Sequence, residues 1–275
     1  MVHLKDGIIY GPVSSRRLGR SLGINVLGAA RKVCTFDCVY CQLRQPRAYA
    51  VDYDSGVAVC KANCHSCRFT QAAPGVDPGR HELPSVAEVL AAVEAAVRAN
   101  PDLQSLTLSG NGEPTLYPRF GDLVDGLVAL RDRLCPMTAV SVLSNASVAA
   151  RPSVRRALRK LDVRIMKLDA GDEDTFRALN RPCPGVALAG VVEGLRRLGA
   201  FTLQTLFVGG RPGNASAEQV EAWLVEVARL RPERIQIYSL DRLPAEGELV
   251  KLSREWLSEV AARARAACGA EVGVY

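Results

Sequence analysis

Apolar positions follow two alternating periods through most of the chain. Between Pro84 and Asn100, valines and leucines recur at helical spacing after a capping box formed by Ser85 and Glu88. Later apolar residues also gather in short runs rich in valine, isoleucine, leucine and threonine, which are typical of buried strands. The pattern predicts strands over 21–27, 103–109, 137–145, 163–169, 201–208 and 234–240.

A helical segment follows each predicted strand. Six strand-then-helix units favour right-handed crossovers and a parallel sheet. They are too few for an eight-stranded barrel but fit an open, curved sheet with its functional groups at the carboxyl ends of the strands. The expected helices cover 85–100, 120–134, 148–161 with an interruption at Pro152, 173–179, 186–199, a segment capped by Ser216 and Gln219, and 253–267.

Residues 42–83 break this alternation. They show weak periodicity and many turn residues, and such a long loop inside a compact domain is usually functional. A chain of 275 residues with 48% hydrophobic and 23% charged residues can form a sizeable core. We therefore expect a single domain over residues 1–275 with a cysteine-rich insert at about 42–83.

The formal net charge of +6 is diffuse and is compatible with an anionic substrate or RNA. With 5% aromatic residues, the chain lacks the basic patches interleaved with aromatics that are typical of RNA-binding modules. Arg16, Arg17 and Arg20 near the start form either a solvated basic turn or a contact for an anion at the mouth of a site.

We expect a cytoplasmic protein. The first residues contain no apolar core of a signal peptide, and no run approaches the ~18 apolar residues of a membrane helix. In a reducing cytoplasm, clustered cysteines indicate metal or redox chemistry.

The segment RKVCTFDCVYCQ (31–42) places Cys34, Cys38 and Cys41 at a C-x3-C-x2-C spacing. Three thiolates so close together can bind three corners of an iron–sulfur cube, which normally has four cysteine ligands, so one iron is left open. Zinc sites more often pair cysteines as C-x2-C and use four ligands. Disulfides are disfavoured because nine cysteines are an odd number and nothing indicates secretion.

The segment CKANCHSC (60–67) repeats this spacing with Cys60, Cys64 and Cys67. Ligand type and spacing favour a second iron–sulfur cluster, with zinc and His65 as a fourth ligand as the alternative. A substrate atom or one of the remaining cysteines could also complete the site; these are Cys135, Cys183 and Cys268.

Polar residues follow one predicted strand after another. After the second strand, Gly110 and Gly112 in SGNGEPTLYP allow a sharp turn and a close approach of the backbone to a ligand. After the third, Ser144 and Asn145 can hydrogen-bond a ribose or cap a helix. Because the carboxyl ends of parallel strands share one edge, these side chains are expected at one mouth.

Lys167 and Asp169 follow the fourth strand, and Tyr238, Asp241 and Arg242 follow the sixth. An inward lysine could contact a carboxylate or, with a depressed pKa, form a Schiff base, whereas an outward lysine would be solvated. The Asp–Arg pair belongs either to the site or to the surface.

Several stretches together resemble the radical S-adenosylmethionine (radical SAM) superfamily. The cysteine triplet with Tyr40 resembles the superfamily's cluster loop, and SGNGEP resembles its GGEP motif, although Asn111 separates the two glycines here. GPVSSRRLGRSLGIN, SNAS, KLDAG, NRP and YSLDR extend the likeness through most of residues 10–245, to small proteins related to wyosine-type tRNA synthases. Those synthases carry auxiliary cysteines before the cluster loop, whereas the extra triplet here follows it, so their tRNA activity is not transferred.

The resemblance implies a partial (β/α)6 TIM-like barrel of the radical SAM type. It implies that Cys34, Cys38 and Cys41 hold a [4Fe–4S] cluster whose open iron binds S-adenosyl-L-methionine (SAM). Reductive cleavage of SAM would then give a 5′-deoxyadenosyl radical that abstracts hydrogen from a substrate. Gly110, Gly112, Glu113 and Pro114 would orient the methionyl end of SAM, and Tyr40, Ser144 and Asn145 would contact its adenosine.

Lys167, Asp169 and Tyr238 are the candidate catalytic residues at the strand ends. The resemblance further implies a small-molecule or nucleotide substrate, an electron donor such as flavodoxin or ferredoxin, and a second triplet that binds substrate or passes an electron. The alternative is an activase of a glycyl radical enzyme, because such activases insert cluster cysteines after the SAM loop, usually more than three. A metal-stabilised RNA-binding module is a third, non-enzymatic interpretation.

Overall fold

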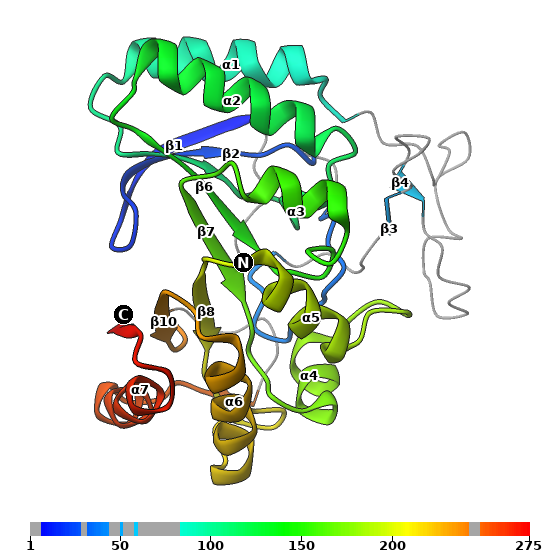
Figure 1. Cartoon of the computed structure of the whole chain (residues 1–275), viewed down its shortest axis with the longest axis vertical. Helices are drawn as coiled ribbons and strands as arrows, with labels where there is room; N and C mark the ends of the chain where they lie inside the picture. Colours follow the sequence, from blue (N-terminus) through cyan, green and yellow to red (C-terminus); the bar gives the residue numbers. More distant parts are fainter. Residues whose placement is uncertain (1–6, 29–31, 44–49, 52–57, 60–82, 242–247) are drawn as a thin grey trace.

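Eight strands form one sheet in the computed structural model, which describes residues 7–28, 32–43, 50–51, 58–59, 83–241 and 248–275. The sheet bends through the middle of the molecule, with helices packed along its outer face (Figure 1). Its spatial order is β1 (Ile9–Ser15), β2 (Gly19–Ile24), β5 (Ser105–Leu108), β6 (Ala139–Ser144), β7 (Val163–Lys167), β8 (Thr202–Leu206), β10 (Arg234–Tyr238) and β12 (Glu271–Val274).

All neighbouring strands from β2 to β12 are parallel, and β1 pairs antiparallel with β2. The six predicted strands and their parallel arrangement are therefore confirmed. The sequence pattern missed β1 and β12, which lengthen the sheet at its two ends. The architecture is a partial barrel of the kind expected.

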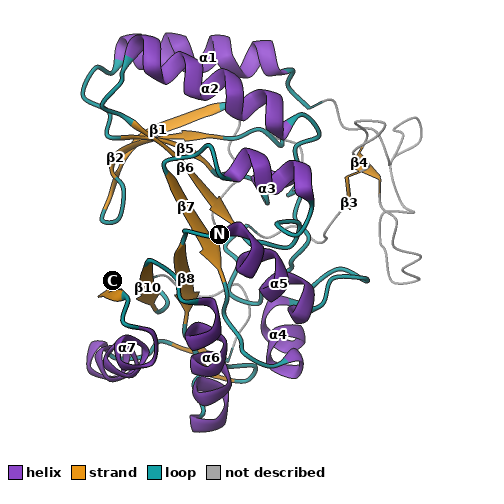
Figure 2. Cartoon of the chain, viewed as in Figure 1, coloured by secondary structure: helices purple, strands orange, loops and turns teal. Residues whose placement is uncertain are grey.

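Seven α-helices of the described chain connect these strands (Figure 2). Capping boxes at Ser85 and Ser216 are present as predicted. The interruption expected at Pro152 is wrong: Pro152 is the first residue of its helix, where a proline costs no backbone hydrogen bond. The helices are α1 (Val86–Ala99), α2 (Phe120–Leu134), α3 (Pro152–Leu158), α4 (Glu173–Asn180), α5 (Leu188–Leu198), α6 (Ala217–Leu230) and α7 (Arg254–Cys268).

The two faces of the sheet differ in polarity because side chains alternate along each strand. Leu106 and Leu108 of β5 are fully buried in the hydrophobic core with the helices. The opposite face of the same strands carries hydroxyls: Ser21 Oγ lies 2.7 Å from Thr107 Oγ1, and Ser105 Oγ lies 2.8 Å from Ser141 Oγ. The concave side is thus polar, whereas the inside of a complete barrel is dominated by bulky branched residues.

Side chains join the two ends of the sheet. The turn between β1 and β2 lies beside β10 and the chain end that follows β12 (Figure 1). Arg17 stands over the ring of Tyr238 at 4.6 Å and near that of Tyr275 at 5.5 Å. Arg16 Nη2 pairs with Asp241 Oδ2 at 2.6 Å. These contacts bridge the opening of the partial barrel.

Short elements complete the described structure. β9 (Gly209–Gly210) pairs with β11 (Leu249–Val250), and within the insert β3 (Ala50–Val51) pairs with β4 (Ala58–Val59). A 3-10 helix, η2 (Pro114–Leu116), follows β5. None of the described helices has the length and apolar character required to span a membrane.

Candidate functional site

The cysteine loop, residues 32–43, follows β2 and is hydrogen-bonded on one side to the turn after β5. Val33 N donates to Asn111 O at 2.9 Å, and Glu113 N donates to Val33 O at 2.8 Å. Gly112 lies between these bonds with a φ of +146°, and a Cβ there would stand 1.7 Å from Val33 O. Only glycine permits so close an approach, so Gly112 holds the start of the loop in place.

The other side of the cysteine loop is bonded to the end of α4. Asp37 N donates to Asn180 O at 3.0 Å, and Val39 N donates to Leu179 O at 3.0 Å. α4 stops at Arg181, which has a left-handed φ of 44°, and the chain then turns alongside the loop. The loop is therefore anchored to two segments that lie far from it in the sequence.

The cysteines of the loop are free thiols, and two of their sulfurs face N–H donors. Asn180 Nδ2 lies 3.4 Å from Cys38 Sγ, Asn145 Nδ2 lies 3.5 Å from Cys34 Sγ, and Phe36 N donates to Cys34 Sγ at 3.4 Å. Burial raises the pKa of Cys34 to about 12 and also raises the pKa of Cys38. Sulfurs that are buried yet surrounded by N–H donors suit metal-bound thiolates, which such donors stabilise.

These side chains fit an iron–sulfur cluster better than a single ion. Within the described residues, no three His, Cys, Asp or Glu side chains converge closely enough to hold one metal ion. In a [4Fe–4S] cluster each thiolate binds a different iron, so the sulfurs stand further apart than around one ion. Cys34, Cys38 and Cys41, three sulfurs of which two have N–H donors beside them, therefore have the donor chemistry that the cluster needs.

Lys32 lies at the start of the loop with only 3% of its side chain exposed. Its Nζ is 3.3 Å from Asp37 Oδ1. Burial alone would lower the pKa of Lys32, but the charges of the neighbouring cysteine thiolates, led by Cys34, and of the Asp37 carboxylate raise it. The ammonium therefore lies in the electrostatic field of the three cysteines.

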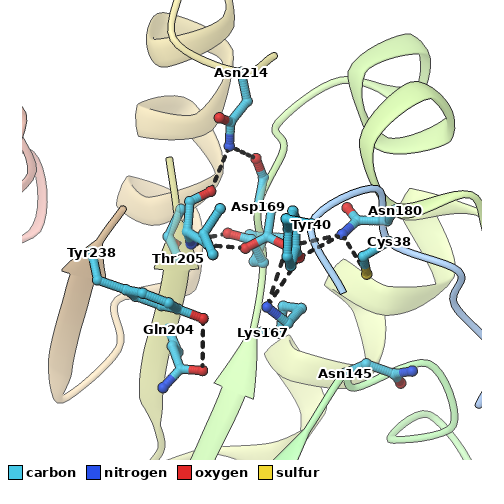
Figure 3. A network of polar contacts seen from close by, with 12 residues as sticks. Cys38, Tyr40, Asn145, Lys167, Asp169, Asn180, Gln204, Thr205, Asn214 and Tyr238 are labelled. Carbon is cyan, nitrogen blue, oxygen red and sulfur yellow. Dashed lines mark hydrogen bonds and ion pairs between the residues drawn. The ribbon is translucent and has the colours of Figure 1, made fainter. Parts of the chain in front are cut away.

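A buried network connects the cysteine loop to the end of β7 (Figure 3). The hydroxyl of Tyr40 donates to Asp169 Oδ2, and Lys167 Nζ donates to the Tyr40 hydroxyl at 3.1 Å. Asn180 Nδ2 contacts Asp169 Oδ2 at 2.8 Å and the Tyr40 oxygen at 3.2 Å. Asp169 Oδ1 also accepts from Leu206 N at 3.0 Å, so one carboxylate ties three segments together.

Lys167 points into this network, and its Nζ lies 3.4 Å from Asp169 Oδ2. Burial would lower the pKa of Lys167, but the Asp169 charge, together with those of Tyr238 and Cys38, raises it overall. The outward orientation considered from the sequence is therefore wrong, and the lysine stays an ammonium at neutral pH.

Glu113 is buried and ties the turn after β5 to the end of β6. Its Oε1 accepts from Ser144 Oγ at 2.8 Å and from Thr115 N at 3.1 Å, and its Oε2 accepts from Asn145 N at 2.5 Å. Burial raises the pKa of Glu113, whereas these donors act in the opposite direction. Asn145 Nδ2 also donates to Thr35 Oγ1 at 2.9 Å, which brings the end of β6 to the cysteine loop.

A cavity of about 430 Å³ opens beside this assembly. It lies between the cysteine loop and the carboxyl end of β10, where the Tyr238 hydroxyl approaches Gln204 Oε1 at 3.4 Å (Figure 3). Asp241 at its edge pairs with Arg16, and Arg242 lies outside the described residues. The lining residues are Tyr40, Cys41, Gln42, Leu206, Tyr238, Ser239, Leu240 and Asp241.

Most of the candidate residues come together at this edge of the sheet. Tyr40, Lys167 and Asp169 form one contact group, and Glu113, Ser144 and Asn145 form a second, next to the turn that contains Gly110, Gly112 and Pro114. Tyr238 lines the cavity that Tyr40 also lines. Cys60, Cys64, Cys67 and His65 lie outside the described residues.

The sequence interpretation missed Lys32 and the amide of Asn180. Lys32 had only its position two residues before the first cysteine as a signal. Asn180 was quoted within the NRP motif, but its contact with Cys38 spans 142 residues of sequence.

The chain is similar to several known proteins. Residues 32–221 match the radical SAM superfamily. A UPF0026 protein of Synechocystis sp. is 30% identical over 83% of this chain and 74% of its own length. A protein of Brachyspira hyodysenteriae named GTPase Obg is 27% identical over 98% of this chain, which spans only 35% of that protein.

Solved structures share the fold at low identity. SuiB of Streptococcus suis bound to S-adenosylmethionine aligns with a TM-score of 0.59 at 12% identity, over 89% of this chain and 48% of that one. TYW1 with a lysine–pyruvate adduct bound aligns with a TM-score of 0.52 at 14% identity, over 90% of this chain and 73% of that one. The similarity of this chain to each of these structures is in the fold.

Proposed function

Because the chain belongs to the radical SAM superfamily and is thus an iron–sulfur enzyme that uses SAM, we propose that it generates a 5′-deoxyadenosyl radical to abstract hydrogen from a small-molecule or nucleotide substrate. The observation that carries this proposal is the cysteine loop, with N–H donors from Asn145 and Asn180 at two of its sulfurs. Cys34, Cys38 and Cys41 would hold the [4Fe–4S] cluster, which with SAM supplies the one-electron chemistry.

The protein's own contribution is positioning, because a primary alkyl radical takes the nearest hydrogen atom. Gly110, Gly112, Glu113 and Pro114 would orient the methionyl end of SAM. Glu113 does so from a carboxylate already fixed by Ser144 and the Asn145 backbone. Such fixed groups need little reorganisation when the ligand binds.

Tyr40 would contact the adenosine of SAM together with Ser144 and Asn145. Its ring lies in the cavity wall and its hydroxyl is held by Asp169. Three donors and acceptors therefore fix the Tyr40 side chain before any ligand arrives, which restricts the adenosine to one side of the cavity.

Lys167, Asp169 and Tyr238 are proposed to act on the substrate at the cavity. TYW1, of similar fold, is solved with a lysine–pyruvate adduct. In this chain Asp169 raises the pKa of Lys167, so the ammonium form favours a contact with an anionic substrate group over attack on a carbonyl. Tyr238 would border the same substrate from β10.

The insert at about 42–83 is proposed to carry an auxiliary [4Fe–4S] cluster, or zinc, on Cys60, Cys64 and Cys67. It would bind substrate or pass an electron that arrives from a flavodoxin or ferredoxin. The activase alternative rests on the same cysteines and would replace the small substrate with the backbone of a partner protein.

Iron and sulfide content, together with SAM cleavage to 5′-deoxyadenosine under dithionite, tests the proposal on anaerobically purified protein. We expect about eight irons per chain in the wild type and about four in each triple Cys→Ala variant, at Cys34/Cys38/Cys41 and at Cys60/Cys64/Cys67. Cleavage should be lost with the first triplet. Cys135→Ala/Cys268→Ala, at the carboxyl ends of α2 and α7, is the control that keeps SAM cleavage and the iron of the first triplet. A wild type without iron and without cleavage would refute the function.

A further inference from the structure

Lys32 is the only lysine or arginine of the described chain that is almost wholly buried. Its Nζ contacts one carboxylate oxygen, Asp37 Oδ1, at 3.3 Å. An ammonium has three donors and is costly to bury without compensation. A fold that places it here must compensate its charge with nearby groups.

Asp37 compensates this charge only partly. Its side chain is 42% exposed, so water screens its charge more than that of Lys32, which is 3% exposed. Lys32 stands two residues before Cys34 in the same loop, and the sulfurs of Cys34, Cys38 and Cys41 also act on its charge. Bound to a cluster, these cysteines are thiolates and carry a fixed negative charge.

We propose that the buried ammonium of Lys32 is the counter-charge of the three cluster-bound thiolates and raises the reduction potential of the cluster. This inference rests on the proposed function, because it requires the cluster. An electron that enters the cluster adds one negative charge. A positive charge nearby in a poorly solvated site favours that reduced state, and net charge is one of the factors that set cluster potentials.

The test measures the midpoint potential of the cluster by a redox titration monitored by electron paramagnetic resonance, with iron content alongside. The background carries Cys60, Cys64 and Cys67 as alanines, so that one cluster gives the signal. We compare Lys32→Met and Lys32→Gln, which remove the charge, with Lys32→Arg, which keeps it, and with Asp37→Asn, which removes only its partner.

Removal of the lysine charge should lower the reduced-to-oxidised ratio at fixed ambient potential about tenfold, which is 59 mV for a one-electron couple. Lys32→Arg should stay close to the parent. Asp37→Asn should move the potential the opposite way, upward, because it removes a negative charge. Shifts of opposite sign in the midpoint potentials of Lys32→Met and Asp37→Asn indicate an electrostatic role. If the lysine only anchored Asp37, the potential would change in the same direction in both variants.

Equal potentials in Lys32→Met and Lys32→Arg, or shifts of the same sign in Lys32→Met and Asp37→Asn, would overturn the inference. If Lys32→Met and Lys32→Gln both fail to retain iron while Lys32→Arg retains it, the charge is required at assembly and the inference stands. Loss of iron in Lys32→Arg as well would overturn it. A parent without iron would instead refute the proposed function, so the two failures are distinguishable.

Discussion

The carbonyl oxygen of Val33 occupies the space that a side chain on Gly112 would need. A Cβ at Gly112 would lie 1.7 Å from that oxygen and 2.4 Å from the Val33 carbonyl carbon. The same contact pairs the cysteine loop with the turn after β5. The absence of one side chain thus determines how close the first cysteine comes to the strand ends.

Gly112→Ala should therefore displace the cysteine loop. We expect a loss of roughly 1–3 kcal/mol in the free energy of unfolding, because the φ of +146° strains any L residue and the contact must open. Iron retention should fall with it. Urea unfolding and iron analysis provide the measurements.

Gly121→Ala is the matched control, since Gly121 lies in α2 and a Cβ there meets nothing within 4 Å. It should be neutral or stabilise by up to about 1 kcal/mol. Equal stability and iron content in the two variants would contradict the steric role of Gly112.

Asp169→Asn tests the buried ion pair with Lys167. It leaves the lysine without its partner, and removal of one partner of a buried pair costs about 3–5 kcal/mol. In the wild type the folded pKa of Lys167 is raised, so its stabilising contribution is complete below the unfolded pKa of 10.5 and is lost as the pH rises through the folded pKa. In the variant, the Asp169 charge no longer opposes the effect of burial, so that pKa falls.

The stability gap between wild type and Asp169→Asn should therefore be widest at about pH 7 and narrow towards about pH 10, where a neutral lysine is no longer costly to bury. Urea unfolding at both pH values measures it. Asp174→Asn, at an exposed position of α4, should change stability by about 0.5 kcal/mol or less at either pH. A gap that stays constant with pH would contradict the role given to the lysine charge.

The parallel sheet could be predicted because its signals are local. Apolar runs such as 103–109 and the capping boxes at Ser85 and Ser216 need no knowledge of distant residues. The two missed strands lack such a signal. β1 is broken by Gly11 and Pro12, and β12 has only four residues with Gly273 among them.

The candidate site likewise contains residues that the sequence predicts and residues that only the folded structure reveals. The cysteine triplet and the strand-end residues follow from spacing and topology. Asn180 acquires its role only on folding, when the cysteine loop meets the end of α4, and Lys32 acquires its role from its burial in the folded loop. Pro152 shows the limit of residue propensity. A proline is favourable in the first turn of a helix and disruptive in its interior, so its effect depends on where the helix begins.

Asn180→Ala removes the amide that contacts Cys38, Tyr40 and Asp169. We expect a loss of about 1–3 kcal/mol, because the buried Asp169 carboxylate loses a donor. Iron should also leave the protein faster when a chelator is added. Asn100→Ala, which removes an amide at the end of α1, is the control and should leave the rate of iron loss unchanged. Equal rates in both variants would contradict a role of the Asn180 amide at Cys38.

Arg17→Ala should loosen the contact between the two ends of the sheet. The guanidinium lies 4.6 Å from the centre of the Tyr238 ring, and such a cation–π contact at a half-buried position contributes about 0.5–2 kcal/mol. Hydrogen exchange should accelerate in the β1–β2 turn and also in β12, because Arg17 contacts Tyr275 as well. Arg16→Ala breaks a pair whose side chains are 58% and 54% exposed, so it should cost less than about 1 kcal/mol and leave β12 unchanged. If both variants gave the same exchange in β12, Arg17 would not hold the ends of the sheet together, and the cavity beside Tyr238 would owe its shape to the strands alone.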